Sequence, residues 1–183
     1  IIWSMFDYNP WAVVIVQSVL DSITCIIIGL TSSLIVPRAF LLGGVLTAIN
    51  MNLVVSSGML LTDSLFLLIF TLFLLFSIIY LKRGSLKFLI LLSLMLSISI
   101  LIRPVSYYLI PILGVSFFWF LLSKKECWQK VVLHIFTFLL TVFILLAPLL
   151  DRNYSKFDTI SITSQTGLHL SRYIVPLAIH FSE

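Results

Sequence analysis

Charged residues are scarce in this chain. They make up 10% of its 183 residues, whereas hydrophobic residues make up 61%. A soluble domain carries more charge and spaces its apolar residues with a regular period. Here the apolar residues form blocks, most of them close to the roughly 20 residues that a helix needs to cross a bilayer. The composition therefore excludes a soluble globular domain and predicts an integral membrane protein in contact with membrane lipids.

Residues that serve soluble enzymes as metal ligands or nucleophiles are few and scattered. The chain has two cysteines and three histidines, without zinc-site spacing. Cys25 lies within an apolar block and Cys127 in a loop, so we expect no disulfide between them. No glycine-rich phosphate loop is present. The net charge of +4 comes from loops beside apolar blocks rather than from a basic patch, so no nucleic acid is expected as a partner.

Six apolar blocks predict six transmembrane helices, because a segment in lipid must satisfy its own backbone hydrogen bonds. Short links make successive helices antiparallel neighbours. The expected fold is all-α, a polytopic bundle over residues 1–150, followed over 151–183 by the start of an outer segment. The predicted spans are Trp11–Val36, Ala39–Ser57, Ser64–Leu81, Leu86–Ile102, Val105–Leu122 and Val131–Leu150.

Basic residues are concentrated in the loops on one side of this bundle, which holds seven of the eleven lysines and arginines. The positive-inside rule makes this side cytoplasmic, so residues 1–10 and 151–183 are expected outside. An outer N-terminus needs a preceding span, and the chain opens on Ile1 without an initiator methionine; we therefore expect an internal fragment. The seven basic residues are Arg38, Lys82, Arg83, Lys87, Lys124, Lys125 and Lys130.

Polar side chains mark the outer part of the second predicted span. Asn50 and Asn52 lie there, followed by Thr62 and Asp63 at the start of the third span. The asparagines favour an outward-open cavity, although such residues also mediate helix contacts in membranes. Thr62 can cap a helix, and Asp63 suits the positive end of its dipole. Asp63 is alternatively a group that orients a substrate or pairs with a cation.

Arg103 closes the fourth predicted span, directly before Pro104, which ends the helix and keeps the arginine at the outer rim. A guanidinium there matches the geometry of a phosphate, but it is also a common interfacial anchor. Arg152 follows the sixth span on the same side of the membrane, and it too is either a phosphate-binding group or an interfacial anchor. Asp21 and Gln17, one turn apart in the first span, form a candidate intramembrane polar site; Asp21 is alternatively a protonated group bonded to a neighbouring helix.

Taken in order, these features resemble a known family. Gln17 and Asp21 precede the stretch "NMNLVVSSGMLLTDSLF", then "LIRP", then "APLLDRNYSKFDTISITSQTG". The combination resembles the membrane core of GT-C glycosyltransferases, in the branch of protein O-mannosyltransferases and lipid A aminoarabinose transferases, over about residues 10–170. Asp63 departs conservatively from the glutamate that is more frequent in the family after the threonine.

The resemblance implies transfer of a sugar from a polyprenyl-phosphate donor to an acceptor on the outer face of the membrane. The family's catalytic acid lies in its first outer loop, so we expect no catalytic residue in this chain and the base upstream of Ile1. Some members use a divalent metal at that loop, whereas nothing in this chain indicates a cofactor or a metal. The substrate-binding residues expected are Arg103 and Arg152 for the phosphate, Thr62 and Asp63 to orient the site or hold a partner cation, and Asn50 and Asn52 to line the cavity.

The leading hypothesis is a bacterial inner-membrane hexosyl- or pentosyltransferase, of which this chain is a central portion that is inactive alone. A transporter or flippase of lipid-linked sugars is the alternative, since it shares an outer cavity with rim arginines. No sequence repetition typical of inverted-repeat transporters is found. A structural membrane subunit is a third class.

Overall fold

The computed structural model describes residues 10–58 and 63–158, and every regular element within these ranges is a helix. The all-α prediction is therefore confirmed for the part of the chain described. The chain divides into two compact units, Ile1–Leu145 and Leu146–Glu183, and each is described by itself. The division falls inside the last helix, so the boundary predicted between residues 150 and 151, which separates membrane from outer segment, stays a prediction.

The first described helix, α2, spans Pro10–Ile35. Proline suits the first helical position because its fixed φ is already helical and its missing N–H has no helical partner there. Hydroxyl groups along α2 bond to carbonyls of the preceding turn, as in Ser18 to Val14 and Thr24 to Leu20, both at 2.9 Å. These bonds satisfy polar groups inside the helix itself, which suits an apolar environment.

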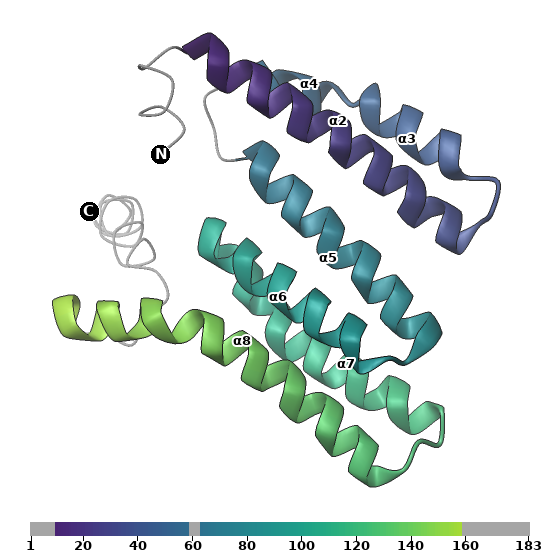
Figure 1. The fold of residues 1–183 in the computed structure, drawn as a ribbon, viewed down its shortest axis with the longest axis vertical. Helices are drawn as coiled ribbons and strands as arrows, with labels where there is room; N and C mark the ends of the chain where they lie inside the picture. The colour runs from purple at the N-terminus through teal and green to yellow at the C-terminus, as the bar shows by residue number, and fades with distance from the viewer. Residues whose placement is uncertain (1–9, 59–62, 159–183) are drawn as a thin grey trace, which may run out of the picture. The chain divides into compact units, whose positions relative to one another are not determined.

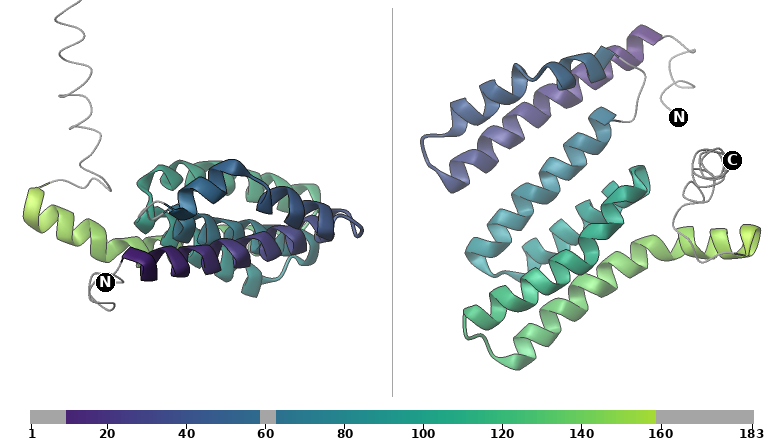
Figure 2. Two further views of the ribbon diagram at one scale, coloured as in Figure 1. Left: turned by 90° about the horizontal axis from the view of Figure 1, so that it is seen from above. Right: turned by 180° about the vertical axis from the view of Figure 1, so that it is seen from behind.

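The second predicted span is divided into two short helices, α3 (Phe40–Ala48) and α4 (Met51–Gly58). The division falls before Asn50, whose carbonyl accepts the N–H groups of Leu53 at 3.0 Å and Val54 at 3.1 Å and so begins α4. Asparagine is a poor residue within a helix and a favoured one at its start. Figure 2 shows α3 and α4 running back along α2.

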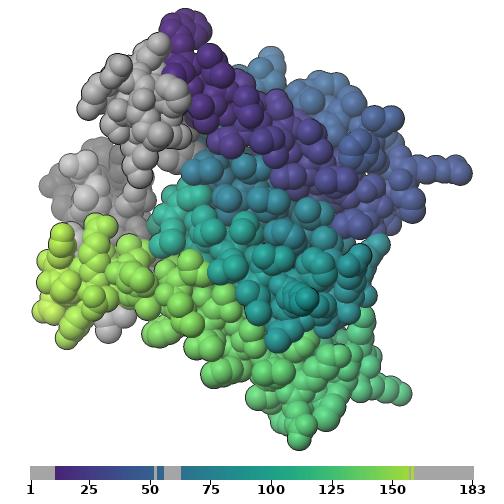
Figure 3. Space-filling model, viewed as in Figure 1, coloured from purple at the N-terminus to yellow at the C-terminus, as the bar shows by residue number. Residues whose placement is uncertain are grey.

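Two helices follow with their long sides in contact, α5 (Asp63–Arg83) and α6 (Leu86–Ile102), joined by a turn at Gly84. Gly84 has a φ of +63°, a conformation that glycine adopts without strain. α5 lies between α2 and α6 (Figure 1), and side chains of α2 and α5 meet along their boundary in the space-filling view (Figure 3). Leucines, an isoleucine and serines of α6 are buried: Leu89, Leu92, Ser93, Leu96, Ser97, Ser99 and Ile100.

The chain continues through the 3₁₀ helix η1 (Pro104–Tyr108), α7 (Leu109–Ser123) and α8 (Trp128–Phe157). Ring contacts connect α7 with its neighbours. Phe117 packs edge-on against Tyr80 of α5, with 5.1 Å between ring centroids, and against Phe138 of α8, with 5.5 Å.

A buried polar pair connects α5 with α8. The Tyr80 hydroxyl lies 2.8 Å from Nδ1 of His134, and both side chains are buried. Each group thereby satisfies the other away from water.

Among the described residues, four helices are long and apolar enough to cross a membrane, and the 17-residue Leu86–Ile102 is a shorter apolar one. Together with the divided α3 and α4, these correspond to the six predicted blocks, although only four reach the length of a full span. The protein is thus a multi-pass membrane protein. The four spans are Trp11–Ile35, Asp63–Arg83, Pro104–Ser123 and Trp128–Lys156.

The loops after α2, α5 and α7 lie at one end of the first unit (Figure 1), here called the basic end because these loops and the adjoining helix turns carry Arg38, Lys82, Arg83, Lys87, Lys124, Lys125 and Lys130. The ammonium of Lys82 donates to the carbonyl of Leu34 at the end of α2. The ammonium of Lys124 donates to the carbonyl of Leu81 at 3.3 Å. The antiparallel course of α5 and α6 then places Asp63 and Arg103 at the opposite end.

Candidate functional site

Asp63 is the first residue of α5, and its carboxylate lies in the first turn, where it favours the positive end of the helix dipole. Its side chain is 24% exposed. The adjacent Thr62 lies outside the described residues, so its capping role stays a prediction. Asp63 is thus positioned to meet groups from other helices as well as the start of its own.

Arg103 ends α6 in an extended conformation, with φ −135° and ψ 109°, which is the backbone region favoured before a proline. Pro104 begins η1 and turns the chain away. The Arg103 guanidinium forms an ion pair with the Asp63 carboxylate and lies 5.5 Å from the ring centroid of Phe66. The arginine side chain is still 45% exposed, so ligands can reach its remaining N–H donors.

Asp21 lies at the middle of α2 and is 5% exposed. The hydroxyl of Ser64 donates a hydrogen bond of 2.9 Å to its carboxylate. Gln17, one turn earlier on α2, is buried on the same side. The prediction from sequence named Asp21 and Gln17 as a polar site but did not name Ser64.

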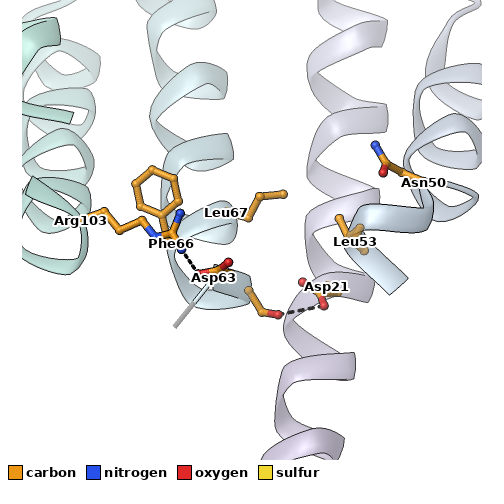
Figure 4. A pocket seen from close by; sticks show the side chains of 8 residues that line it. Asp21, Asn50, Leu53, Asp63, Phe66, Leu67 and Arg103 are labelled. Carbon is orange, nitrogen blue, oxygen red and sulfur yellow. Dashed lines mark hydrogen bonds and ion pairs between the residues drawn. The ribbon is translucent and has the colours of Figure 1, made fainter. Parts of the chain in front are cut away.

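These contacts surround a pocket with a volume of about 180 Å³. Figure 4 shows Arg103 at the end of α6, Asp63, Phe66 and Leu67 on α5, Asp21 on α2, and Asn50 and Leu53 at the start of α4. Its lining residues are Asp21, Asn50, Leu53, Asp63, Ser64, Phe66, Leu67 and Arg103. Four residues predicted from sequence, Asp21, Asn50, Asp63 and Arg103, therefore share one cavity, although they lie far apart along the chain.

Besides Thr62, two predicted substrate-binding residues, Asn52 and Arg152, are not placed at this pocket. The side chain of Asn52 lies outside what the structure describes. Arg152 is an exposed residue of α8 in the second unit, and its contact with a phosphate stays a prediction.

Four other residues of the pocket lining were not predicted from the sequence: Leu53, Ser64, Phe66 and Leu67. The spacing of three and four residues from Asp63 to Phe66 and Leu67 places them on one face of α5, which is the signal that would have identified them.

The pocket carries more acid than base, with the carboxylates of Asp21 and Asp63 against one guanidinium. Within the described ranges, no group of three or more His, Cys, Asp or Glu side chains is arranged to hold a metal ion. The carboxylates and Asn50 can hydrogen-bond to hydroxyl groups of a ligand, and Arg103 can bind an anion.

Comparison with curated proteins gave no match, and comparison with solved structures gave none either. A family model, that of dolichyl-phosphate-mannose-protein mannosyltransferases, matches residues 1–150. The match covers the whole first unit, including Asp21, Asp63 and Arg103. The resemblance inferred from sequence is confirmed, and the chain belongs to this family of membrane glycosyltransferases.

Proposed function

We propose that this protein takes part in transferring a sugar from a polyprenyl-phosphate donor to an acceptor on the outer face of the membrane. The observation that carries the proposal is the Asp63–Arg103 ion pair in the lining of a pocket that also holds Asp21 and Asn50, in a chain of this family. Membership in a transferase family favours this function over the transporter or flippase alternative. We propose further that the transferred sugar is a hexose or a pentose.

The charges of the pocket suggest how the donor would lie. Arg103 reaches Asp63 from one side, and Ser64 reaches Asp21 on the other. A phosphate next to two carboxylates would be repelled, so we assign it to the exposed donors of Arg103 at the rim. The hydroxyl groups of the sugar would then meet Asp21, Ser64 and Asn50, which accept or donate hydrogen bonds.

The pocket is smaller than the roughly 300 Å³ at which complete small-molecule sites begin, so it would accommodate only part of such a donor. Asp63 would keep the guanidinium oriented through their ion pair.

A charge exchange tests the phosphate role. Arg103→Ala should abolish sugar transfer in the full-length protein, assayed with a polyprenyl-phosphate sugar, while membrane insertion is retained. The double change Asp63→Arg with Arg103→Asp should restore the ion pair and the stability but not the transfer. Removing a group used only to stabilise the transition state typically lowers the rate by about 10²–10³-fold.

The control is Arg83→Ala, which removes an arginine at the basic end and should leave transfer unchanged. Recovery of transfer in the exchanged double variant would show that the pair is structural and would overturn the phosphate role. For Asp63 alone, Asp63→Glu should retain more transfer than Asp63→Asn, because only glutamate keeps the charge.

A further inference from the structure

A second cavity lies in the first unit, away from the pocket of Asp63 and Arg103. It is a groove between α7 and α8 with a volume of about 260 Å³, lined by seven side chains that are all apolar. Phe118 of α7 and Trp128 of α8 contact each other edge-on at 6.1 Å, and Phe136 and Leu139 lie further along α8. The two helices are joined at the basic end (Figure 2), so the groove begins directly beneath that loop.

The loop above the groove ends α7 in a Schellman motif. The Glu126 N–H donates to the Leu121 carbonyl at 3.2 Å, and the Lys125 N–H donates to the Leu122 carbonyl at 2.9 Å. Lys125 occupies the left-handed position of this motif, with a φ of +52°. Glycine is the residue that suits this position, and the corresponding turn after α5 does use one, Gly84.

A lysine in a strained left-handed conformation suggests that its charge has a use there. The neighbouring lysines are engaged elsewhere. Lys124 donates to Leu81 of α5 and lies 4.6 Å from the Phe120 ring. Lys130, in the first turn of α8, pairs with Glu126 at 2.8 Å.

That hydrogen bond from Lys130 lowers the pKa of the Glu126 carboxyl, so Glu126 is ionised at neutral pH and offsets part of the charge of Lys130. Three lysines nevertheless face one acid in this loop and the first turn of α8. The loop is therefore cationic above an apolar groove. Among the described residues, Lys125 has no side-chain hydrogen bond or ion pair, which leaves its charge for a ligand.

We propose that this groove binds an anionic phospholipid, with the phosphate at Lys125 and one acyl chain along Phe118, Val132 and Leu139. The complementarity has two parts: a cationic mouth for the headgroup and an apolar channel for the chain. Trp128, which is exposed, lies between them at the level where indole rings favour the membrane interface. The bilayer itself supplies the ligand, and the inference does not depend on the glycosyltransferase function.

The test uses the protein in nanodiscs of phosphatidylcholine and phosphatidylglycerol in equal amounts, followed by native mass spectrometry of the lipids that stay bound. Wild-type protein should retain phosphatidylglycerol in preference. Lys125→Gly should retain roughly fivefold less, the effect of one lysine at an anionic surface. Val132→Trp, which fills the groove, should also reduce retention.

Thermal unfolding separates binding from structure, because glycine suits the backbone at residue 125 and Lys125→Gly should leave the melting temperature unchanged or raised. Lys87→Gln is the matched control, since it removes an exposed lysine at the basic end outside the groove lining. Equal retention of the two lipids, an equal loss in Lys87→Gln, or a second copy of the chain in place of lipid would each overturn the proposal.

Discussion

At the scale of single residues, Arg103 is fixed by three neighbours before any ligand arrives. Its backbone is extended because Pro104 follows, its guanidinium pairs with Asp63, and the Phe66 ring lies beneath it. A cation in this position need not reorganise to meet an anion, which is the property that makes preorganised groups effective. The sequence placed Arg103 at the end of its helix because proline has a local effect that needs no tertiary information.

Asp21, unlike Arg103, has a partner that no local sequence pattern predicts. Its position within an apolar span indicated a partner, but the partner is Ser64, 43 positions away in the sequence. No local pattern pairs an acid with one serine among many, because serine hydroxyls along these helices also bond to their own backbone. The contact exists only because α2 and α5 pack together.

Ser64→Ala should lower the free energy of unfolding by about 1 kcal/mol, the size of a hydrogen bond between membrane helices. The buried Asp21 carboxylate loses its donor in this variant. Equilibrium unfolding in mixed micelles measures the change. Ser18→Ala is the control, because this exposed hydroxyl donates to Val14 of its own helix. Equal effects of the two substitutions would contradict a special role for the contact between α2 and α5.

At the scale of elements, glycine sets how closely α2 and α3 approach. A Cβ atom built on Gly43 would lie 2.3 Å from the Ser32 hydroxyl oxygen and 2.8 Å from its Cβ. One built on Gly29 would lie 2.9 Å from the carbonyl oxygen of Phe40. Small residues of this kind allow backbones to pack closely in membranes, where helices gain little from the hydrophobic effect.

Gly43→Leu should therefore separate α2 from α3 and lower stability by about 1–3 kcal/mol, as for an overpacked core. Gly114→Leu is the matched control, because nothing lies within 4 Å of a Cβ at that position of α7. Equilibrium unfolding of both variants gives the comparison. If Gly43→Leu is as stable as Gly114→Leu, the close approach of these helices does not contribute to stability.

Helix boundaries show where sequence reasoning failed at this scale. The length and hydropathy of the second predicted span favoured one continuous helix. In the structure the helix is interrupted, because α3 ends at Ala48 and α4 begins at Met51. The break places Asn50 and Leu53, at the start of α4, in the wall of the pocket. Hydropathy averages over a window and therefore does not register one residue that begins a new helix.

At the scale of the whole molecule, the distribution of charge agrees with the course of the helices through the first unit. Lysines from separate loops reach carbonyls at the ends of neighbouring helices, which brings the basic residues to one end. Asp63 and Arg103 meet at the other. The positive-inside rule then predicts that the basic end is cytoplasmic and that the pocket faces outward.

Cysteine labelling in membrane vesicles tests this orientation. In a Cys25→Ser variant, the exposed Cys127 at the basic end should react with an impermeant maleimide only from the cytoplasmic side. A cysteine introduced at Val105, an exposed residue near Arg103, should react only from the outer side when Cys25 and Cys127 are both serine. Labelling of the two positions from the same side would contradict the antiparallel course, and exchanged sides would reverse the orientation.

The sequence alone determined that this is an all-α membrane protein, where the helix Leu86–Ile102 begins and ends, its family, and that acids and an arginine lie toward one side. These properties depend on composition, on proline and on the length of apolar blocks, all of which act locally. Only the tertiary structure decided which groups meet. Asp63 with Arg103, Ser64 with Asp21 and Tyr80 with His134 join different helices. Such contacts depend on helix rotation and packing, which small residues set and which hydropathy does not encode.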